Sequence, residues 1–165
     1  MADKSSFTKE EWTSLLESPV MAGMAVTAAD PSGIWGLLKE SFASGGALAE
    51  PIADSKANAL VKAVAADFAT TEGRSAARDG LKEKLAGGKA VEVRTKSIDS
   101  LRQVSALLNA KAPGDAAAFK DWLRQISQRT ADAAVEGGGL LGIGGVQVSD
   151  AEKATLAEVS SALGS

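Results

Sequence analysis

The chain has 165 residues, with 18 basic and 21 acidic side chains, a formal net charge of −3, and no cysteine, histidine or tyrosine. Without cysteine, disulfides, thiolate metal sites and cysteine nucleophiles are excluded. Without histidine, the chain lacks the side chain that most often titrates near neutral pH and most often ligates transition metals. The slightly acidic balance argues against nucleic-acid binding, which needs a surplus of basic residues on one face.

The length suits one domain with its own hydrophobic core, so we expect residues 1–165 to form a single domain. Alanine and other helix formers dominate, and apolar residues recur at helical spacing. This pattern predicts an all-α bundle of about six to seven short-to-medium helices. Trp12, Trp35 and Trp122 each lie on an apolar stripe and are expected in the core.

The first helix has a clear start and an ambiguous middle. Thr8 and Glu11 have the spacing of a capping box, in which each side chain binds the other residue's backbone N–H. Pro19 has two interpretations. It either interrupts one long helix, or it occupies the first position of a second helix that Ser18 caps.

Glycine and proline divide the middle of the chain into further segments. We expect a turn at 30–33, a helix that ends at 45–46, a connector at 51–55, a helix from about Lys56 that closes at Glu72-Gly73, and a helix over 74–86.

Residues 89–96 depart from the helical pattern. Val91 and Val93 alternate with polar residues, and this period of two is typical of a strand. The expected partner is 145–148, and two strands this short form a token ribbon at most. Val91 and Val93 would also fit the start of a helix.

The remaining helices are expected from about 97 to 110, and from Asp115 to the glycines at 137–139. The last helix is expected to begin at Ser149, which has the spacing of a second capping box with Glu152.

An apolar segment follows Pro19. Residues 19–29 are apolar nearly all round, so a helix formed from them should be central or covered on two sides. Met21 and Met24 are adaptable side chains that fill gaps in a core and also suit a contact surface or a ligand pocket.

A second apolar segment, 137–148, contains no charged residue and combines glycines with Leu140, Leu141 and Ile143. Large apolar side chains in a loop either tuck under the bundle or contact a partner or a second copy of the chain. Residues 137–142 formally match G-x-G-x-x-G, but they follow a helix and not the strand that a dinucleotide site requires.

The carboxylates offer little chemistry in the sequence. Asp132 and Glu136 share a helix face and could hold a hard cation, but no histidine or calcium-loop motif accompanies them. Solvated surface acids are the better account of this pair, and also of Glu10, Glu11 and Glu17.

With no catalytic motif, the sequence predicts a non-catalytic protein that needs no cofactor and acts through an unidentified protein partner or as a homo-oligomer. No secretory signal is visible, and the most apolar stretch, 18–38, is broken at 30–33, so we expect a cytoplasmic protein without a membrane span. The alternative is a carrier or sensor of a small apolar molecule, with a pocket between helices. The candidate contact residues are Met21, Met24, Trp35, Trp122, Leu140, Leu141 and Ile143.

Overall fold

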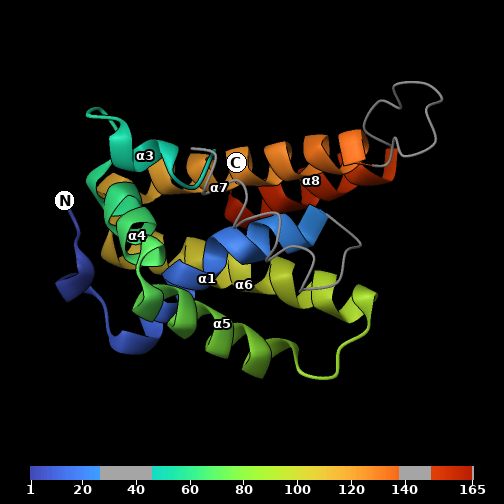
Figure 1. Cartoon of the computed structure of the whole chain (residues 1–165), viewed down its shortest axis with the longest axis horizontal. Coiled ribbons are helices and arrows are strands. Elements are labelled where there is room, and N and C mark those ends of the chain that lie inside the picture. The colour runs from blue at the N-terminus through green and yellow to red at the C-terminus, as the bar shows by residue number, and fades with distance from the viewer. Residues whose placement is uncertain (27–45, 138–149, 165) are drawn as a thin grey trace.

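A computed structural model describes residues 1–26, 46–137 and 150–164, and these residues form helices and no strand (Figure 1). This confirms the predicted all-α bundle. The elements are η1 (Lys4–Ser6), α1 (Lys9–Val26), α3 (Glu50–Ala53), α4 (Ala59–Ala69), α5 (Thr71–Leu85), α6 (Ala90–Lys111), α7 (Pro113–Gly137) and α8 (Asp150–Leu163). Within these ranges, no helix is both long and apolar enough to cross a bilayer.

Helix α1 occupies the centre of the bundle. It packs against α4, α5, α6, α7 and α8, with α7 and α8 above it and α5 below it in Figure 1. Every residue from Leu15 to Val26 is buried. The prediction that the apolar run after Pro19 forms a covered helix is therefore confirmed as far as Val26.

Pro19 lies inside α1, so the interpretation of one long helix is correct. Proline has no N–H, and the carbonyl of Leu15, four residues earlier, therefore loses its usual helical donor. The Ser18 hydroxyl donates to this carbonyl oxygen at 2.7 Å. Ser18 thus replaces the missing backbone hydrogen bond within a buried stretch.

The start of α1 is as predicted. The N–H of Thr8 donates to Glu11 Oε2 at 2.7 Å, and the N–H of Glu11 donates to Thr8 Oγ1 at 3.2 Å. Phe7 precedes this capping box and packs on Trp12, with the two ring centroids 6.0 Å apart.

The boundary between α4 and α5 was predicted at Gly73 and lies instead at Thr70. Thr70 Oγ1 accepts the N–H of Gly73 at 2.9 Å and donates to the Asp67 carbonyl at 2.7 Å. A Cβ at Gly73 would lie 2.0 Å from that same carbonyl oxygen. Gly73 is therefore needed for a close approach within the first turn of α5, and it does not end a helix.

The predicted strand at 89–96 is wrong, because α6 begins at Ala90. The N–H of Lys89 donates to Glu92 Oε2 at 3.1 Å, which provides a helical start. Val93 is 6% exposed and faces the core, while Val91 is 76% exposed. Only one of the two valines faces inward, as helical geometry requires, and the proposed partner 145–148 lies outside the described residues.

Other boundaries shift by a few residues. The connector predicted at 51–55 contains the short helix α3, and α7 begins at Pro113, with Asp115 in its first turn and not at its cap. The helix predicted after 30–33 lies outside the described residues, and so does Ser149, the predicted start of the last helix.

We predict that Ser18→Ala lowers the free energy of unfolding by about 1–3 kcal/mol, because a buried carbonyl then lacks a donor. Pro19→Ala restores an N–H to this turn, so adding Ser18→Ala in that background should cost less than about 0.5 kcal/mol. Urea unfolding of the four proteins measures both losses. Ser14→Ala is the control, since the Ser14 hydroxyl donates to the Glu10 carbonyl at the exposed start of the helix. Equal losses in both backgrounds would refute this role of Ser18.

Candidate functional site

The structure places only some of the predicted contact residues. Met21, Met24 and Trp122 are buried in the core, and the Trp122 indole N–H donates to the Ala47 carbonyl at 2.8 Å. Trp35, Leu140, Leu141 and Ile143 lie outside the described residues. Of the three that are described, Met21 lines a hollow that opens at the surface.

This hollow has a volume of about 250 Å³ and lies between α1 and α6, and we call it the α1–α6 groove. Its lining combines carboxylates, hydroxyls and one ammonium group with a few apolar side chains. The lining residues are Glu10, Glu11, Ser14, Glu17, Ser18 and Met21 from α1, Lys84 from α5, and Ser100, Gln103, Val104 and Leu107 from α6.

Glu17 is the most unusual residue of the groove. Its side chain is only 2% exposed, so the prediction that it is a solvated surface acid is wrong. Glu17 Oε2 forms an ion pair with Lys84 Nζ, and the Lys84 side chain is 38% exposed. The uninterrupted buried stretch of α1 begins at Leu15, before the apolar run that follows Pro19, and α5 packs against this helix.

Gly80 allows α5 to approach this carboxylate. A Cβ at Gly80 would lie 1.9 Å from Glu17 Oε1 and 3.3 Å from Thr13 Cγ2. The backbone of α5 is therefore one wall around the Glu17 side chain. Glycine is a poor helix former, so Gly80 in the interior of a helical pattern was a sequence sign of this site.

The groove carboxyls differ in proton affinity. Burial raises the pKa of Glu17 above its ordinary value of 4.5, and the hydrogen bond and charge of Lys84 oppose this effect only in part. At the outer end, the hydrogen bond from Lys111 lowers the pKa of Glu11. The pKa of Glu10 is lowered by hydrogen bonds from the backbone N–H of Glu10 and from the Thr8 hydroxyl. The groove thus combines two ionised outer acids with one inner acid that resists ionisation.

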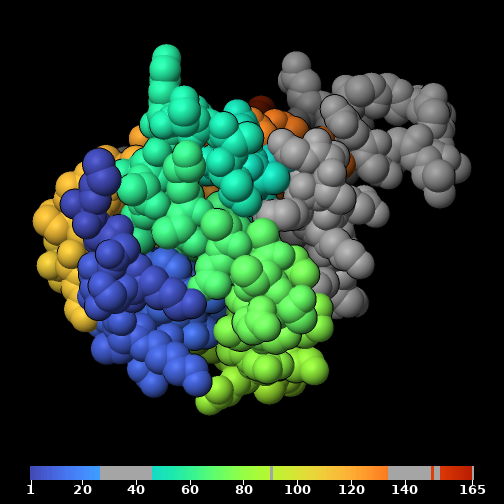
Figure 2. Space-filling view, turned by 60° about the vertical axis from the view of Figure 1, so that its left-hand side comes forward, coloured from blue at the N-terminus to red at the C-terminus, as the bar shows by residue number. Residues whose placement is uncertain are grey.

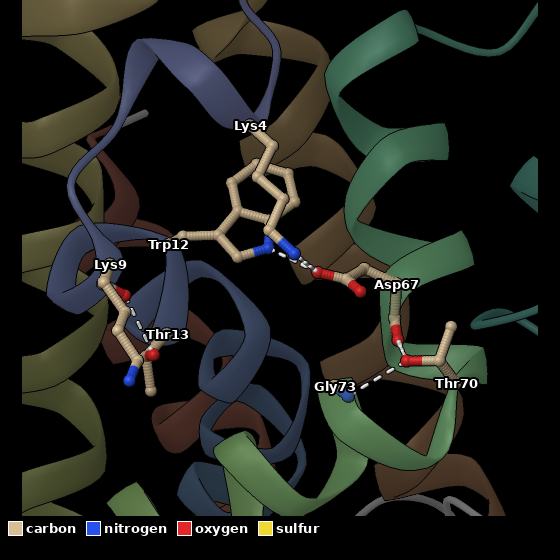
Figure 3. Close-up of polar contacts among 7 residues, drawn as sticks. All are labelled: Lys4, Lys9, Trp12, Thr13, Asp67, Thr70 and Gly73. Atoms are coloured by element: carbon tan, nitrogen blue, oxygen red, sulfur yellow. Dashed lines mark hydrogen bonds and ion pairs between the residues drawn. The ribbon is translucent and has the colours of Figure 1, made fainter.

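A second polar cluster, around Asp67, has a structural role (Figure 3). Asp67 Oδ2 accepts hydrogen bonds from Trp12 Nε1 at 2.6 Å and from Lys4 Nζ at 2.8 Å. Burial raises the pKa of Asp67, but these two partners outweigh burial and lower it overall. The cluster attaches the N-terminal arm to α4, and the arm lies beside α4 in Figure 2.

Asp115 shows how a buried carboxylate is satisfied elsewhere in this fold. Its Oδ2 accepts the N–H of Ala2 at 2.8 Å, and its Oδ1 accepts Asn58 Nδ2 at 2.8 Å. The hydrogen bond from Ala2 is the main cause of its lowered pKa. Glu17 differs, because among described residues only Lys84 donates to its carboxylate, and only to Oε2.

A second hollow of about 250 Å³ lies between α7 and α8. Its one charged lining residue, Arg124, pairs with Asp121 at 2.6 Å. No group of three or more acidic residues within the described ranges is arranged to hold a metal ion. The α1–α6 groove is therefore the better candidate site.

Comparison of the chain with protein-family models, with curated proteins and with solved structures finds no match.

We predict unequal effects from the two members of the Glu17–Lys84 pair. Lys84→Met leaves a buried carboxylate without its cation and should lower the free energy of unfolding at neutral pH by about 3 kcal/mol. Glu17→Gln leaves an ammonium that water reaches, and should cost less than about 1 kcal/mol. Urea unfolding measures both, with Lys82→Met as the exposed control on α5.

The decrease in the free energy of unfolding caused by Lys84→Met should become smaller as the pH is lowered. The pKa of Glu17 is raised in the folded state, so the folded protein binds a proton before the unfolded chain does. The penalty for burying the charge is therefore relieved as the pH falls through the folded-state pKa toward 4.5. A loss that is independent of pH, or a larger loss from Glu17→Gln, would contradict this account.

Proposed function

We propose that this chain is a cytoplasmic, non-catalytic binding protein, and that the α1–α6 groove is its ligand site. The observation that carries the proposal is the Glu17 carboxylate, which is buried in the central helix and lines an open hollow. A buried ion pair is often no more stable than apolar residues of similar volume. A perturbed, buried acid beside a hollow is a common feature of functional sites.

The other groups of the groove favour binding over chemistry. The hydroxyls of Ser14 and Ser18 donate to the backbone carbonyls of Glu10 and Leu15, and no described base accepts a proton from either of them. Lys84 is engaged in the ion pair with Glu17. A nucleophile needs an adjacent base or a lowered pKa, and neither serine has one among its described partners.

The size of the groove favours a small ligand. Pockets for drug-sized ligands have volumes of about 300–1,000 Å³, and this groove has about 250 Å³. With three carboxylates on its lining, the groove also differs from the pocket expected around Met21, Met24, Trp35 and Trp122. That carrier hypothesis stays a prediction, because Trp35 lies outside the described residues and neither Met24 nor Trp122 lines the groove.

Self-association also stays a prediction from the sequence. The large apolar side chains exposed among the described residues are Met1, Ile52 and Val91. The sequence prediction of a contact between copies rests on the uncharged segment 137–148, most of which lies outside the described residues. The solution mass of the purified protein measures this directly.

A fragment screen by NMR tests the proposed function. We expect small polar fragments to shift backbone amide signals of α1 and α6 around the groove, and Glu17→Gln to abolish these shifts. Glu72→Gln removes the same charge from an exposed site on α5 and should leave the shifts unchanged. If a library of cationic, anionic and neutral fragments shifts no amide signal of the groove, or shifts only signals elsewhere, the proposal is overturned.

A further inference from the structure

We infer that the ligand of the α1–α6 groove is an alkyl diamine, with one ammonium group on Glu17 in place of Lys84 and the other on Glu10. The inference rests on the proposed function and adds the chemical class of the ligand. It depends on three parts of the groove, namely its inner end, its middle and its outer end.

The inner end selects a cation. Glu17 is 2% exposed, and its one described donor is the Lys84 ammonium. A neutral or anionic ligand that displaced Lys84 would leave this carboxylate buried without a counter-ion, which is costly. An incoming ammonium would preserve the ion pair.

Lys84 is suited to such an exchange. It is 38% exposed and has a flexible four-carbon stem, so its ammonium can return to water when another cation takes its place. The exchange replaces one ammonium–carboxylate contact by another and requires no new buried charge.

The middle of the groove suits a methylene chain. Val104 and Leu107 of α6 supply apolar surface along the groove, and Ser14 lies between Glu10 and Glu17 on α1. At about 30 Å³ for each water-sized group, the volume of about 250 Å³ has room for roughly eight such groups. An aliphatic diamine with seven carbons has nearly this number of non-hydrogen atoms.

The outer end offers a second carboxylate. Glu11 is paired with Lys111 at 2.6 Å, whereas Glu10 forms no ion pair with any described residue. Glu10 precedes Glu17 by seven residues on the same helix, which is about 10 Å along its axis. Extended 1,7-diaminoheptane spans about this distance, whereas putrescine is too short to do so.

Calorimetric titration of the full chain at low ionic strength tests the inference. We expect 1,7-diaminoheptane to bind about tenfold more tightly than putrescine or heptylamine, and 1,7-heptanediol and pimelate to show no binding. Glu17→Gln should lower the affinity for 1,7-diaminoheptane at least about tenfold. Glu10→Gln should lower the affinity for the diamine to that of heptylamine, while the affinity for heptylamine stays unchanged. Glu72→Gln is the control for the removal of one negative charge and should change nothing.

One further probe identifies the source of the ammonium. Nα-acetyl-lysine amide carries the same group on a protein-like stem. If Nα-acetyl-lysine amide binds more tightly than 1,7-diaminoheptane, the inference of a diamine ligand is overturned. The groove is then assigned to a lysine side chain of a protein partner.

The ammonium inference is overturned if no amine binds, or if amines bind Glu17→Gln as well as the wild type. If fragments shift the groove signals while amines do not, the ammonium inference fails and the proposed function stands. If neither binds there, both fail.

Discussion

The architecture depends on burying a whole stretch of one helix on every side. From Leu15 to Val26, α1 has no face left for solvent, so each polar group on it must find a partner within the protein. Ser18 meets this condition by serving the Leu15 carbonyl that Pro19 leaves without a donor. Glu17 meets it through an ion pair with one half-exposed lysine, Lys84.

The packing around Glu17 links the core to the surface. Gly80 brings the backbone of α5 against one carboxylate oxygen, and Lys84, one turn later on the same helix, supplies the cation for the other. The same helix thus both encloses the charge and neutralises it. Lys84 lines the groove and its side chain is 38% exposed, so the cation that pairs with the buried charge is reachable from the groove.

Much of the fold follows from local sequence, while the site does not. The capping box at Thr8 and the core position of Trp122 could be predicted, because capping and amphipathic spacing act over a few residues. The boundary at Thr70 was missed because glycine signals both helix ends and close packing, and Gly73 serves the second purpose.

Glu17 was assigned to the surface because sequence periodicity around α1 does not reveal that α5 packs there. Its burial depends on contacts between residues more than sixty positions apart. The local trace of this contact is Gly80, a glycine in the interior of the amphipathic helix α5.

The ionisation of Glu17 tests the central claim most directly. An NMR titration of its ¹³C-labelled side-chain carboxyl should give a pKa above the ordinary 4.5, because burial opposes the charge, and Lys84→Met should raise that pKa further. A pKa at or below 4.5 in the wild type, or one unchanged by Lys84→Met, would contradict a buried carboxylate held by a single exchangeable cation.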